Sequence, residues 1–409
     1  MVWQRPGVRP GCGSGHCKAC LDLPSRGYAD RFLNVYVGKV FITYRPAPPA
    51  MRAPSKTLTL VHVVFSSRLA GGELHCVDLA NAQAALGHRV HVIGVAGSAV
   101  EGALAPSVRF HGLKLPLLRG LRVAALARRL GADVCHGHLG PACKAVAHAG
   151  SAARIGTLHV GYKAHHHAHL DGLVCVNRAQ HDSLPENREG LARLIYNWAP
   201  ERAAAPAAAG LRAELGLAPG QLLVGSVGRL QQAKGMDLLV AGFKAHAPAD
   251  AVLAILGEGP DRALLEQLAA GDPRIRLLGF RRDVDRALQA FDLFVSASRE
   301  EAFPLAILEA MRAGRPVLAT ATQGPVEMLA GQPARLVPVG DADGLGRALA
   351  EEVARLRPLP REQRSVRYAT AAYDRGHAVD RTLAFYRDVM LYRAPQAQHY
   401  EDEDEAFAS

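Results

Sequence analysis

Two basic residues in the second half of the chain have the spacing that a phosphate-bearing ligand requires. Gly228 and Arg229 directly follow the apolar run 222–227, and Lys234 with Gly235 comes shortly afterwards. Arginine and lysine bind phosphate oxygens, and a glycine at a strand end allows a ligand to approach the backbone. The spacing therefore predicts a diphosphate site at the mouth of a crevice. Two ordinary surface cations in a loop are the alternative.

Two acidic residues flank the start of the next helical pattern, which begins near Pro304. Glu301 lies before the expected first turn and Glu309 lies within the helix. Free amides at a helix N-terminus attract phosphate oxygens, and carboxylates accept hydrogen bonds from the hydroxyls of sugar and ribose. Glu309 has apolar neighbours and therefore needs a partner. Together the acidic and basic residues indicate a ligand that carries both phosphates and a sugar.

The first half of the chain contributes glycines and histidines at similar positions. Gly71 and Gly72 follow one expected strand and open a helix, so a ligand could approach the backbone there. His159 ends another expected strand and could contact the sugar or a leaving phosphate, whereas a structural role is the alternative. The histidine run 165–167, with His169, is expected to be a solvated loop without a catalytic ion.

The elements that must position these side chains alternate between strands and helices. The strands are short apolar runs at 58–65 and 89–93, near 134, 155 and 173, and then at 222–227, 252–256, 275–278, 293–295 and 317–319. A helical pattern follows most of these runs, as in a doubly wound parallel sheet, which binds ligands at the carboxyl ends of its strands. The predicted fold class is α/β, with two facing Rossmann-like doubly wound domains and a cleft between them.

Changes in composition divide the 409 residues into five expected segments. They are a Gly-, Pro- and Arg-rich extension over 1–50 that is disordered or not part of the native protein, a Rossmann-like domain over 51–203, a second one over 204–375, a helix over 376–393 that returns to the first domain, and an acidic disordered tail over 394–409. The hydrophobic content of 49% is sufficient for two cores.

Charge, cysteines and hydropathy limit the class of protein. Residues 51–200 hold sixteen Lys and Arg against eight Asp and Glu, which would suit an anionic membrane surface or a phosphorylated substrate, and no nucleic-acid motif accompanies the charge. The seven cysteines imply no disulfide framework, and a zinc site within 12–20 lacks a second ligand pair. No apolar run is long enough to span a bilayer. We expect a cytoplasmic protein, with peripheral contact at the inner face of the cytoplasmic membrane left open.

The span from about residue 58 to 390 resembles the GT-B glycosyltransferases of family 4, which are retaining enzymes that use nucleotide-activated sugars. The resemblance rests on a series of motifs in order: Gly71-Gly72 before a helix, Asp133-Val-Cys-His136-Gly-His138, Thr157-Leu-His159, Gly228-Arg229-Leu with Lys234-Gly235, Gly257-Glu-Gly-Pro260, Gly279-Phe280 and the Glu301/Glu309 pair. It implies that the second domain binds the nucleotide sugar and that the first domain selects the acceptor.

The resemblance also implies a role for each matching residue of this chain. The positions it implies for catalysis, through the diphosphate and the transferring sugar, are His159, Arg229, Lys234 and Glu301. The positions it implies for binding the rest of the donor, including its ribose hydroxyls and base, are Gly71, Gly72, Gly228, Gly279, Phe280, Arg281, Phe303, Leu305 and Glu309. No covalent nucleophile, cofactor or metal ion is implied, because the leaving diphosphate assists deprotonation of the acceptor.

One motif departs from the family pattern. Relatives often have Glu-Gly-Phe-Gly-Leu where this chain has Glu301-Ala302-Phe303-Pro304-Leu305. Pro304 has no amide N–H, so the phosphate contact must come from its neighbours.

The acceptor is expected to be a glycan or a lipid-linked glycan of lipopolysaccharide or another surface polysaccharide. Arginines on the helical stretch 117–130 favour a membrane-surface acceptor, and an ordinary amphipathic helix is the alternative. Two other functions remain open on the same fold. They are a nucleotide-sugar 2-epimerase, which needs no acceptor, and an inactive sugar-nucleotide-binding protein.

Overall fold

A computed structural model describes residues 33–37, 40–44, 56–199 and 209–408. The chain divides into two compact units, Met1–Lys56 and Thr57–Ser409. In the first unit, β1 (Leu33–Val37) and β2 (Val40–Tyr44) form an antiparallel pair within the stretch expected to be an extension. The cysteines at 12, 17 and 20 lie outside the described residues, so the expectation that they form no zinc site stays untested.

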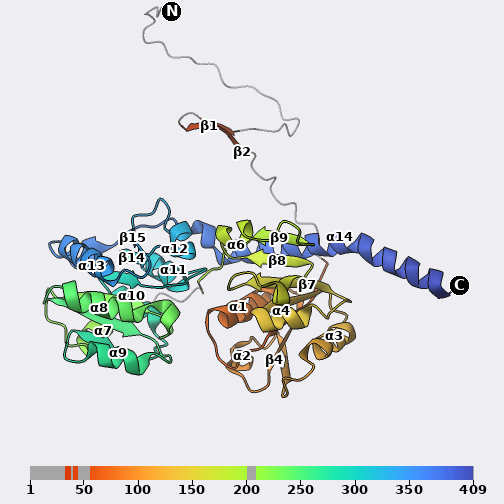
Figure 1. The fold of residues 1–409 in the computed structure, drawn as a ribbon, viewed down its shortest axis with the longest axis horizontal. Coiled ribbons are helices and arrows are strands. Elements are labelled where there is room, and N and C mark those ends of the chain that lie inside the picture. The colour runs from red at the N-terminus through yellow and green to blue at the C-terminus, as the bar shows by residue number, and fades with distance from the viewer. Residues whose placement is uncertain (1–32, 38–39, 45–55, 200–208, 409) are drawn as a thin grey trace, which may run out of the picture. The chain divides into compact units, whose positions relative to one another are not determined.

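The second unit begins with a seven-stranded parallel sheet in the order β5-β4-β3-β6-β7-β8-β9 (Figure 1). Its strands are β3 (Thr59–Val64), β4 (Arg89–Val95), β5 (Arg109–Leu113), β6 (Val134–His138), β7 (Ala153–Leu158), β8 (Gly172–Cys175) and β9 (Leu191–Leu194). Its helices are α1 (Gly71–Ala85), α2 (Ala99–Ala103), α3 (Arg119–Leu130), α4 (Gly140–Val146), α5 (Ala164–His167) and α6 (Arg178–Asp182). We call this part the first lobe.

A six-stranded parallel sheet follows in the order β12-β11-β10-β13-β14-β15. Its strands are β10 (Leu222–Val227), β11 (Ala251–Leu256), β12 (Ile275–Leu277), β13 (Leu293–Ser296), β14 (Val317–Thr320) and β15 (Arg335–Val337). Its helices are α7 (Ala209–Glu214), α8 (Met236–His246), α9 (Arg262–Ala269), α10 (Val284–Ala290), α11 (Leu305–Arg312), α12 (Gln323–Met328) and α13 (Ala342–Leu356), with the 3-10 turns η1 (Gln232–Lys234), η2 (Arg361–Arg364) and η3 (Ala371–Tyr373). We call this part the second lobe. The two sheets confirm the predicted fold class.

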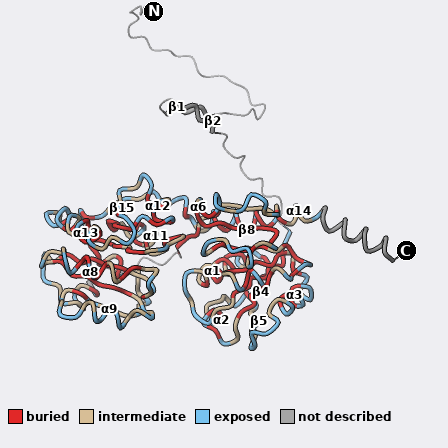
Figure 2. Tube along the Cα trace, viewed as in Figure 1, coloured by how far each residue is buried: buried red, intermediate tan, exposed pale blue. Residues whose placement is uncertain are grey.

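Both sheets are covered on both faces, which explains their nearly continuous apolar strands. In β3, Leu60 and Val64 pack into one core cluster, whereas Val61 and Val63 pack into another on the opposite face. In β11, Val252 belongs to one cluster of the second lobe, and the neighbouring residues alternate between that cluster and the opposite one. Figure 2 shows the buried residues concentrated along the strands. The side chains that alternate on each strand therefore fill four separate layers of core.

The last helix, α14 (Arg375–Ala408), leaves the second lobe and packs on the first. Phe385, Tyr386 and Val389 are fully buried in the core between the first sheet and α1. The helix continues to Ala408, through the stretch that the sequence led us to expect as a disordered tail. Glutamate favours the helix, and an existing helix gains one hydrogen bond for each residue added, which accounts for the difference.

Hydrogen bonds join the two lobes next to α6. The Asn177 side-chain amide donates to the Ala302 carbonyl at 2.7 Å, and the Arg178 amide donates to the Glu327 carboxylate at 2.7 Å. The Tyr196 hydroxyl donates to the same carboxylate at 2.6 Å. These bonds tie the turn before α11 to the first lobe.

Candidate functional site

Two of the predicted cations lie at the carboxyl end of the second sheet. Gly228 and Arg229 directly follow β10, and Lys234 ends the short turn η1. The Lys234 ammonium forms an ion pair with the Glu301 carboxylate, and both side chains are partly buried. Arg229 is exposed and makes no hydrogen bond or ion pair with any residue that the structure describes. The structure therefore brings Lys234 and Glu301 together, and it leaves the exposed Arg229 guanidinium without a partner among the described residues.

A second ion pair fixes the loop that carries Glu301. Arg299 binds Asp237 at the start of α8 through two hydrogen bonds of 2.7 and 2.6 Å, which lower the pKa of the Asp237 carboxyl. The Arg299 amide also donates to the Ala233 carbonyl at 2.8 Å. Gly235 closes η1 with φ of 61°, and a Cβ there would lie 2.0 Å from the Ala297 carbonyl oxygen. Only glycine fits this contact, which holds η1 against the loop.

The first turn of helix α11 closely follows Glu301, the partner of Lys234, in the sequence. The Leu305 amide is not free, because it donates to the Phe303 carbonyl at 3.1 Å. The amides of Ala306 and Ile307 have no acceptor among the described residues. Phe303 is buried, with its ring 5.6 Å from that of Tyr373, so its side chain belongs to the core. For the Leu305 amide to bind a phosphate as expected, its hydrogen bond to the Phe303 carbonyl would have to break.

The predicted base-binding turn follows β12. Gly279 accepts a 2.8 Å hydrogen bond from the Gly257 amide at the neighbouring strand end, and the Phe280 side chain is 71% exposed. The Arg281 guanidinium is bound by the carboxylates of Asp283 and Glu214, which raise its pKa. Contact of this turn with a base stays a prediction.

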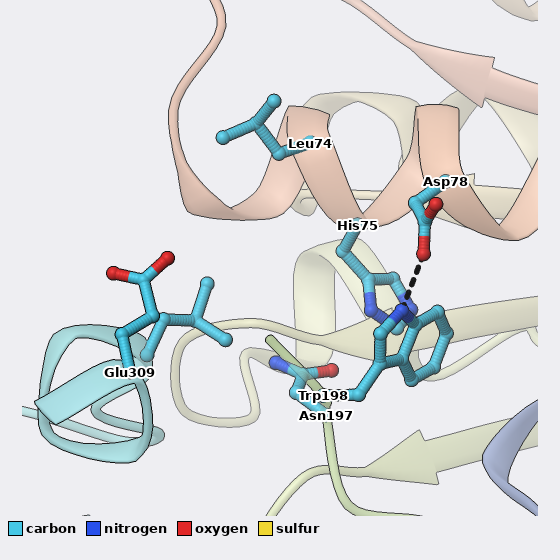
Figure 3. Close-up of a pocket in the computed structure, with 7 residues that line it drawn as sticks. Leu74, His75, Asp78, Asn197, Trp198 and Glu309 are labelled. Carbon is cyan, nitrogen blue, oxygen red and sulfur yellow. Dashed lines mark hydrogen bonds between the residues drawn. The ribbon is translucent and has the colours of Figure 1, made fainter. Parts of the chain in front are cut away.

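A pocket between α1 and α11 joins residues of both lobes (Figure 3). Its lining residues are Leu74, His75, Asp78, Asn197, Trp198, Leu305 and Glu309. Gly71 lies at the same junction, since a Cβ at this position would be 3.5 Å from the Leu305 Cδ1 atom. Of the predicted donor-binding residues, Gly71, Leu305 and Glu309 therefore gather at this junction.

Five of the lining residues, which are Leu74, His75, Asp78, Asn197 and Trp198, were not identified from the sequence. The Trp198 indole N–H donates to Asp78 at 2.5 Å, as Figure 3 shows, and Arg375 at the start of α14 binds the same carboxylate at 2.6 Å. The His75 ring lies on the Trp198 indole, with 4.5 Å between ring centroids. The spacing of Gly71, His75 and Asp78 along one helix face is the sequence signal that could have found them.

His159 lies beside the glycines that open α1. A Cβ on Gly72 would be 3.3 Å from the His159 ring and 2.9 Å from a methyl group of Leu139. The ring contacts His138, with Nε2 of His159 3.4 Å from Nδ1 of His138, and it makes an edge contact with His75. Burial lowers the pKa of His159 to about 4, so the imidazole is neutral near pH 7.

Two groups of side chains in the first lobe have the spacing of metal ligands. Ligand atoms of His75, His138 and His159 lie within 4.8 Å of one another, as do those of His62, Cys76 and His138. Burial raises the pKa of the Cys76 thiol and so disfavours the thiolate that a metal needs. The expectation of a solvated loop at 165–167 is wrong, because these histidines lie in the short helix α5 and His167 is buried. They are absent from both groups in the described part of the chain.

Comparison with known proteins places the two lobes in one class. Residues 69–205 match the family model described as Glycosyltransferase Family 4, and residues 221–356 match the model described as Glycosyl transferases group 1. The two matches follow each other along the chain and each covers one of the two sheets. The chain belongs to this family of glycosyltransferases, as its motifs predicted.

Individual relatives agree with the family. The chain is 34% identical over 147 residues to the lipopolysaccharide core biosynthesis glycosyltransferase LpsE of Rhizobium meliloti, covering 35% of this chain and 43% of LpsE. It is 31% identical over 199 residues to LpsD of the same organism, covering 47% and 54%. The matched region thus spans about half the length of these relatives. Anabaena HepE, solved in complex with UDP and glucose, superposes with a TM-score of 0.66 at 18% identity, covering 81% of this chain and 100% of HepE, and so confirms the GT-B fold.

Proposed function

We propose that this protein is a retaining glycosyltransferase that moves a sugar from a nucleoside diphosphate sugar to a hydroxyl of a glycan or glycolipid. The observation that carries the proposal is the pairing of Lys234 with Glu301 at adjoining strand ends, beside the first turn of α11. This pairing supports the proposal, because a lysine suits phosphate oxygens and a carboxylate suits sugar hydroxyls.

The donor would lie across the carboxyl ends of β10 and β13. Lys234 and the exposed Arg229 would bind the diphosphate, with the amides of Ala306 and Ile307 adding donors at the positive end of α11. Glu301 would exchange part of its bond to Lys234 for a sugar hydroxyl. The two side-chain cations supply the charge that stabilises the leaving diphosphate, so we propose transfer without a bound metal ion.

The remaining donor contacts would come from both lobes. Glu309 on α11 would accept the ribose hydroxyls, and the turn at 279–281 would frame the base. Gly71 and Gly72 would allow the sugar to approach the start of α1, next to His159. The acceptor hydroxyl would enter from the first lobe and lose its proton to the departing diphosphate on the same face of the sugar.

The relatives point to a biological setting. LpsE and LpsD act in lipopolysaccharide core biosynthesis by their names, and HepE was crystallised with UDP and glucose. We therefore propose a hexose donor and an acceptor in lipopolysaccharide core or another surface polysaccharide. A thermal-shift screen of UDP, GDP, ADP and CMP sugars would identify the donor, because a ligand of the folded state raises Tm.

Donor-dependent transfer by purified protein tests the proposal. Lys234→Ala and Glu301→Ala should each lower kcat/KM about 10²-fold to 10³-fold, as the loss of one stabilising donor does elsewhere. Lys144→Ala is the matched control, because Lys144 is an exposed lysine of the first lobe outside the site. Unchanged turnover in both site variants would refute the assignment. Conversion of the donor without an acceptor, followed by nuclear magnetic resonance, would instead show an epimerase.

A cluster of exposed leucines suggests where the acceptor lipid would lie. Leu115, Leu117, Leu118 and Leu121, at the start of α3, have exposed fractions of 56%, 67%, 68% and 59%. The exposed cations Lys114 and Arg122 lie beside them in the sequence, whereas Val123 faces the core. No helix in the described residues is both long and apolar enough to cross a bilayer. We propose that this leucine cluster contacts an anionic membrane surface as part of acceptor binding.

Sedimentation with vesicles tests this contact. The protein should bind vesicles that contain phosphatidylglycerol and should not bind pure phosphatidylcholine. Replacing Leu117 and Leu121 by serine should abolish binding without lowering Tm, because both side chains are exposed. Equal binding by this double variant and the native chain would exclude the cluster.

A further inference from the structure

A row of polar side chains crosses the otherwise apolar layer between the first sheet and helices α1 and α14. All are almost completely buried, with exposed fractions of 1% or less. They come from three adjacent strands and from both helices, and they are His62, Gln83, His136, His138, Thr157 and Tyr386. Since water does not reach them, their N–H groups and lone pairs must be satisfied by one another.

One branch of this row leads from Gln83 to the pocket side of the lobe. The Gln83 side-chain oxygen lies 2.7 Å from Nε2 of His62. Nδ1 of His62 lies 3.0 Å from Nε2 of His138, and Nδ1 of His138 lies 3.4 Å from Nε2 of His159. The branch ends at His159, whose Nδ1 has no hydrogen-bond partner among the described residues.

The other branch leads from the same glutamine into α14. The Gln83 side-chain nitrogen lies 3.4 Å from the Tyr386 hydroxyl. That hydroxyl lies 2.6 Å from Nδ1 of His136, and Nε2 of His136 lies 2.8 Å from the Thr157 hydroxyl. Gln83 is therefore the one group shared by both branches.

The hydrogen-bond partners decide which atoms carry the protons. The Gln83 side-chain nitrogen donates to the Tyr386 hydroxyl, which leaves the Tyr386 proton to donate across the 2.6 Å contact to Nδ1 of His136. This leaves the Gln83 carbonyl facing His62, in agreement with the 2.7 Å contact there.

The direction then passes from ring to ring. His62 and His138 are fully buried and neither ring has a hydrogen bond to a carboxylate among the described residues, so each ring is neutral and has one N–H. His62 uses its Nε2–H on Gln83, so its Nδ1 must accept from Nε2–H of His138. Nδ1 of His138 must in turn accept from Nε2–H of His159. Each step leaves only one arrangement that satisfies both rings.

We propose that Gln83 is a positioning residue that fixes the tautomer of His159, leaving Nδ1 of His159 as a hydrogen-bond acceptor for a hydroxyl of the bound sugar. The tautomer is a property of the free protein. Its use on a sugar hydroxyl rests on the proposed function. A donor sugar without the matching hydroxyl would offer no proton to Nδ1 and would leave this partly buried acceptor without that hydrogen bond.

Nitrogen-15 spectra of histidine-labelled protein test the tautomer without any substrate. Protonated and unprotonated ring nitrogens have widely separated shifts, and loss of signals in His159→Gln assigns the ring. We expect His62, His138 and His159 each to be protonated on Nε2 and unprotonated on Nδ1. The reverse pattern on His159, with Nδ1 protonated, would overturn the proposal whatever the protein catalyses.

Two substitutions test the role of Gln83. Gln83→Met keeps the volume but removes both hydrogen bonds, so the His159 ring should show a mixture of tautomers. Gln83→Glu should restore the native pattern, because a buried carboxyl is protonated and offers one carbonyl and one O–H. Gln180→Met is the matched control, since Gln180 is a buried glutamine of the same lobe outside the row. A native His159 spectrum in folded Gln83→Met would overturn the proposal.

Kinetics with a series of monodeoxy donors test the use of the tautomer. Gln83→Met should lower kcat/KM for the intact donor roughly tenfold, as the loss of one hydrogen bond does. For the donor that lacks the hydroxyl facing His159, native protein and Gln83→Met should be equal. An equal defect with every donor would overturn the contact, although the tautomer and the transferase activity would both stand.

Metal analysis of the purified protein provides a last check. A tetrahedral zinc ion with bonds of about 2.0–2.1 Å would also place two ligand nitrogens about 3.4 Å apart. We expect no stoichiometric metal and no change in the His159 spectrum after chelation. Zinc bound at one per chain, with shifts of both His138 and His159 on its removal, would overturn the proposal.

Discussion

Replacing Gly72 by alanine should separate the stability of the protein from its activity. Gly72 lies in the first turn of α1 and has a negative φ, so alanine fits the backbone and favours the helix by up to about 1 kcal/mol. Its Cβ would lie 2.9 Å from a Leu139 methyl group and 3.3 Å from the His159 ring. Ordinary contacts begin near 3.4 Å, so either the Leu139 methyl or the start of α1 must move by about 0.5 Å, and the His159 ring must move by about 0.1 Å.

We expect this displacement to lower kcat/KM. A displacement of 1 Å at a reacting group costs about 10²-fold in rate. The predicted loss in kcat/KM is therefore about 1.6-fold (about 0.3 kcal/mol) if only His159 moves by about 0.1 Å, and roughly tenfold (about 1.4 kcal/mol) if the start of α1 moves by about 0.5 Å. Steady-state kinetics with the donor found by thermal shift would measure it, with Tm recorded in parallel. Gly102→Ala is the matched control, because Gly102 is a helical glycine with open space around it. Native kcat/KM in folded Gly72→Ala would refute the placement of His159 at the sugar.

Three further perturbations have outcomes set by the same geometry. Gly235→Ala should lower the free energy of unfolding by at least about 2 kcal/mol in urea titration, since φ is 61° and the Cβ would meet the Ala297 carbonyl; near-native stability would contradict this. Leu118→Gly should raise the free energy of unfolding by up to about 1 kcal/mol in the same titration, because φ of Leu118 is 54° and the side chain is exposed. The pKa of His62 and that of His159 are about 4 in the folded protein, so the unfolded chain takes up protons first as pH falls below 6.5. Lowering the pH from 7.5 to 5.5 should reduce the free energy of unfolding by about 1 kcal/mol for each of these histidines. A Tm that does not fall over this range would contradict their burial as neutral rings.

The strands at the centre of each sheet could be predicted from the sequence, whereas most of those at the edges could not. The run 222–227 matches β10 residue for residue, because a strand between two neighbours and two layers of helices is almost entirely apolar, with Ser226 as its one polar residue. β5, β9 and β15 were missed, and all three are edge strands. β5 contains Arg109 and His111 because one side of an edge strand faces solvent.

The candidate site divides in the same way. Lys234 and Glu301 could be found because charged residues at strand ends are visible in sequence, and the structure pairs them. Asp78, Trp198 and Arg375 could not, because the bonds that join them connect residues 120 and 297 positions apart. These three residues meet only because separate helices and loops pack together, and a local sequence pattern cannot indicate such contacts. The part played by Arg281 stays a prediction, since its guanidinium is held by two carboxylates.

The position of α14 has a consequence for how the protein is made. Tyr386 and Phe385 of α14 fill the core of the first lobe, whose strands emerge from the ribosome some two hundred residues earlier. Until the end of the chain has been synthesised, that lobe exposes an unfilled apolar face and an unanchored Gln83. The first lobe therefore cannot complete its core, or the hydrogen bond between Gln83 and Tyr386, before the last helix docks. We expect a truncated chain that lacks α14 to aggregate and to be inactive.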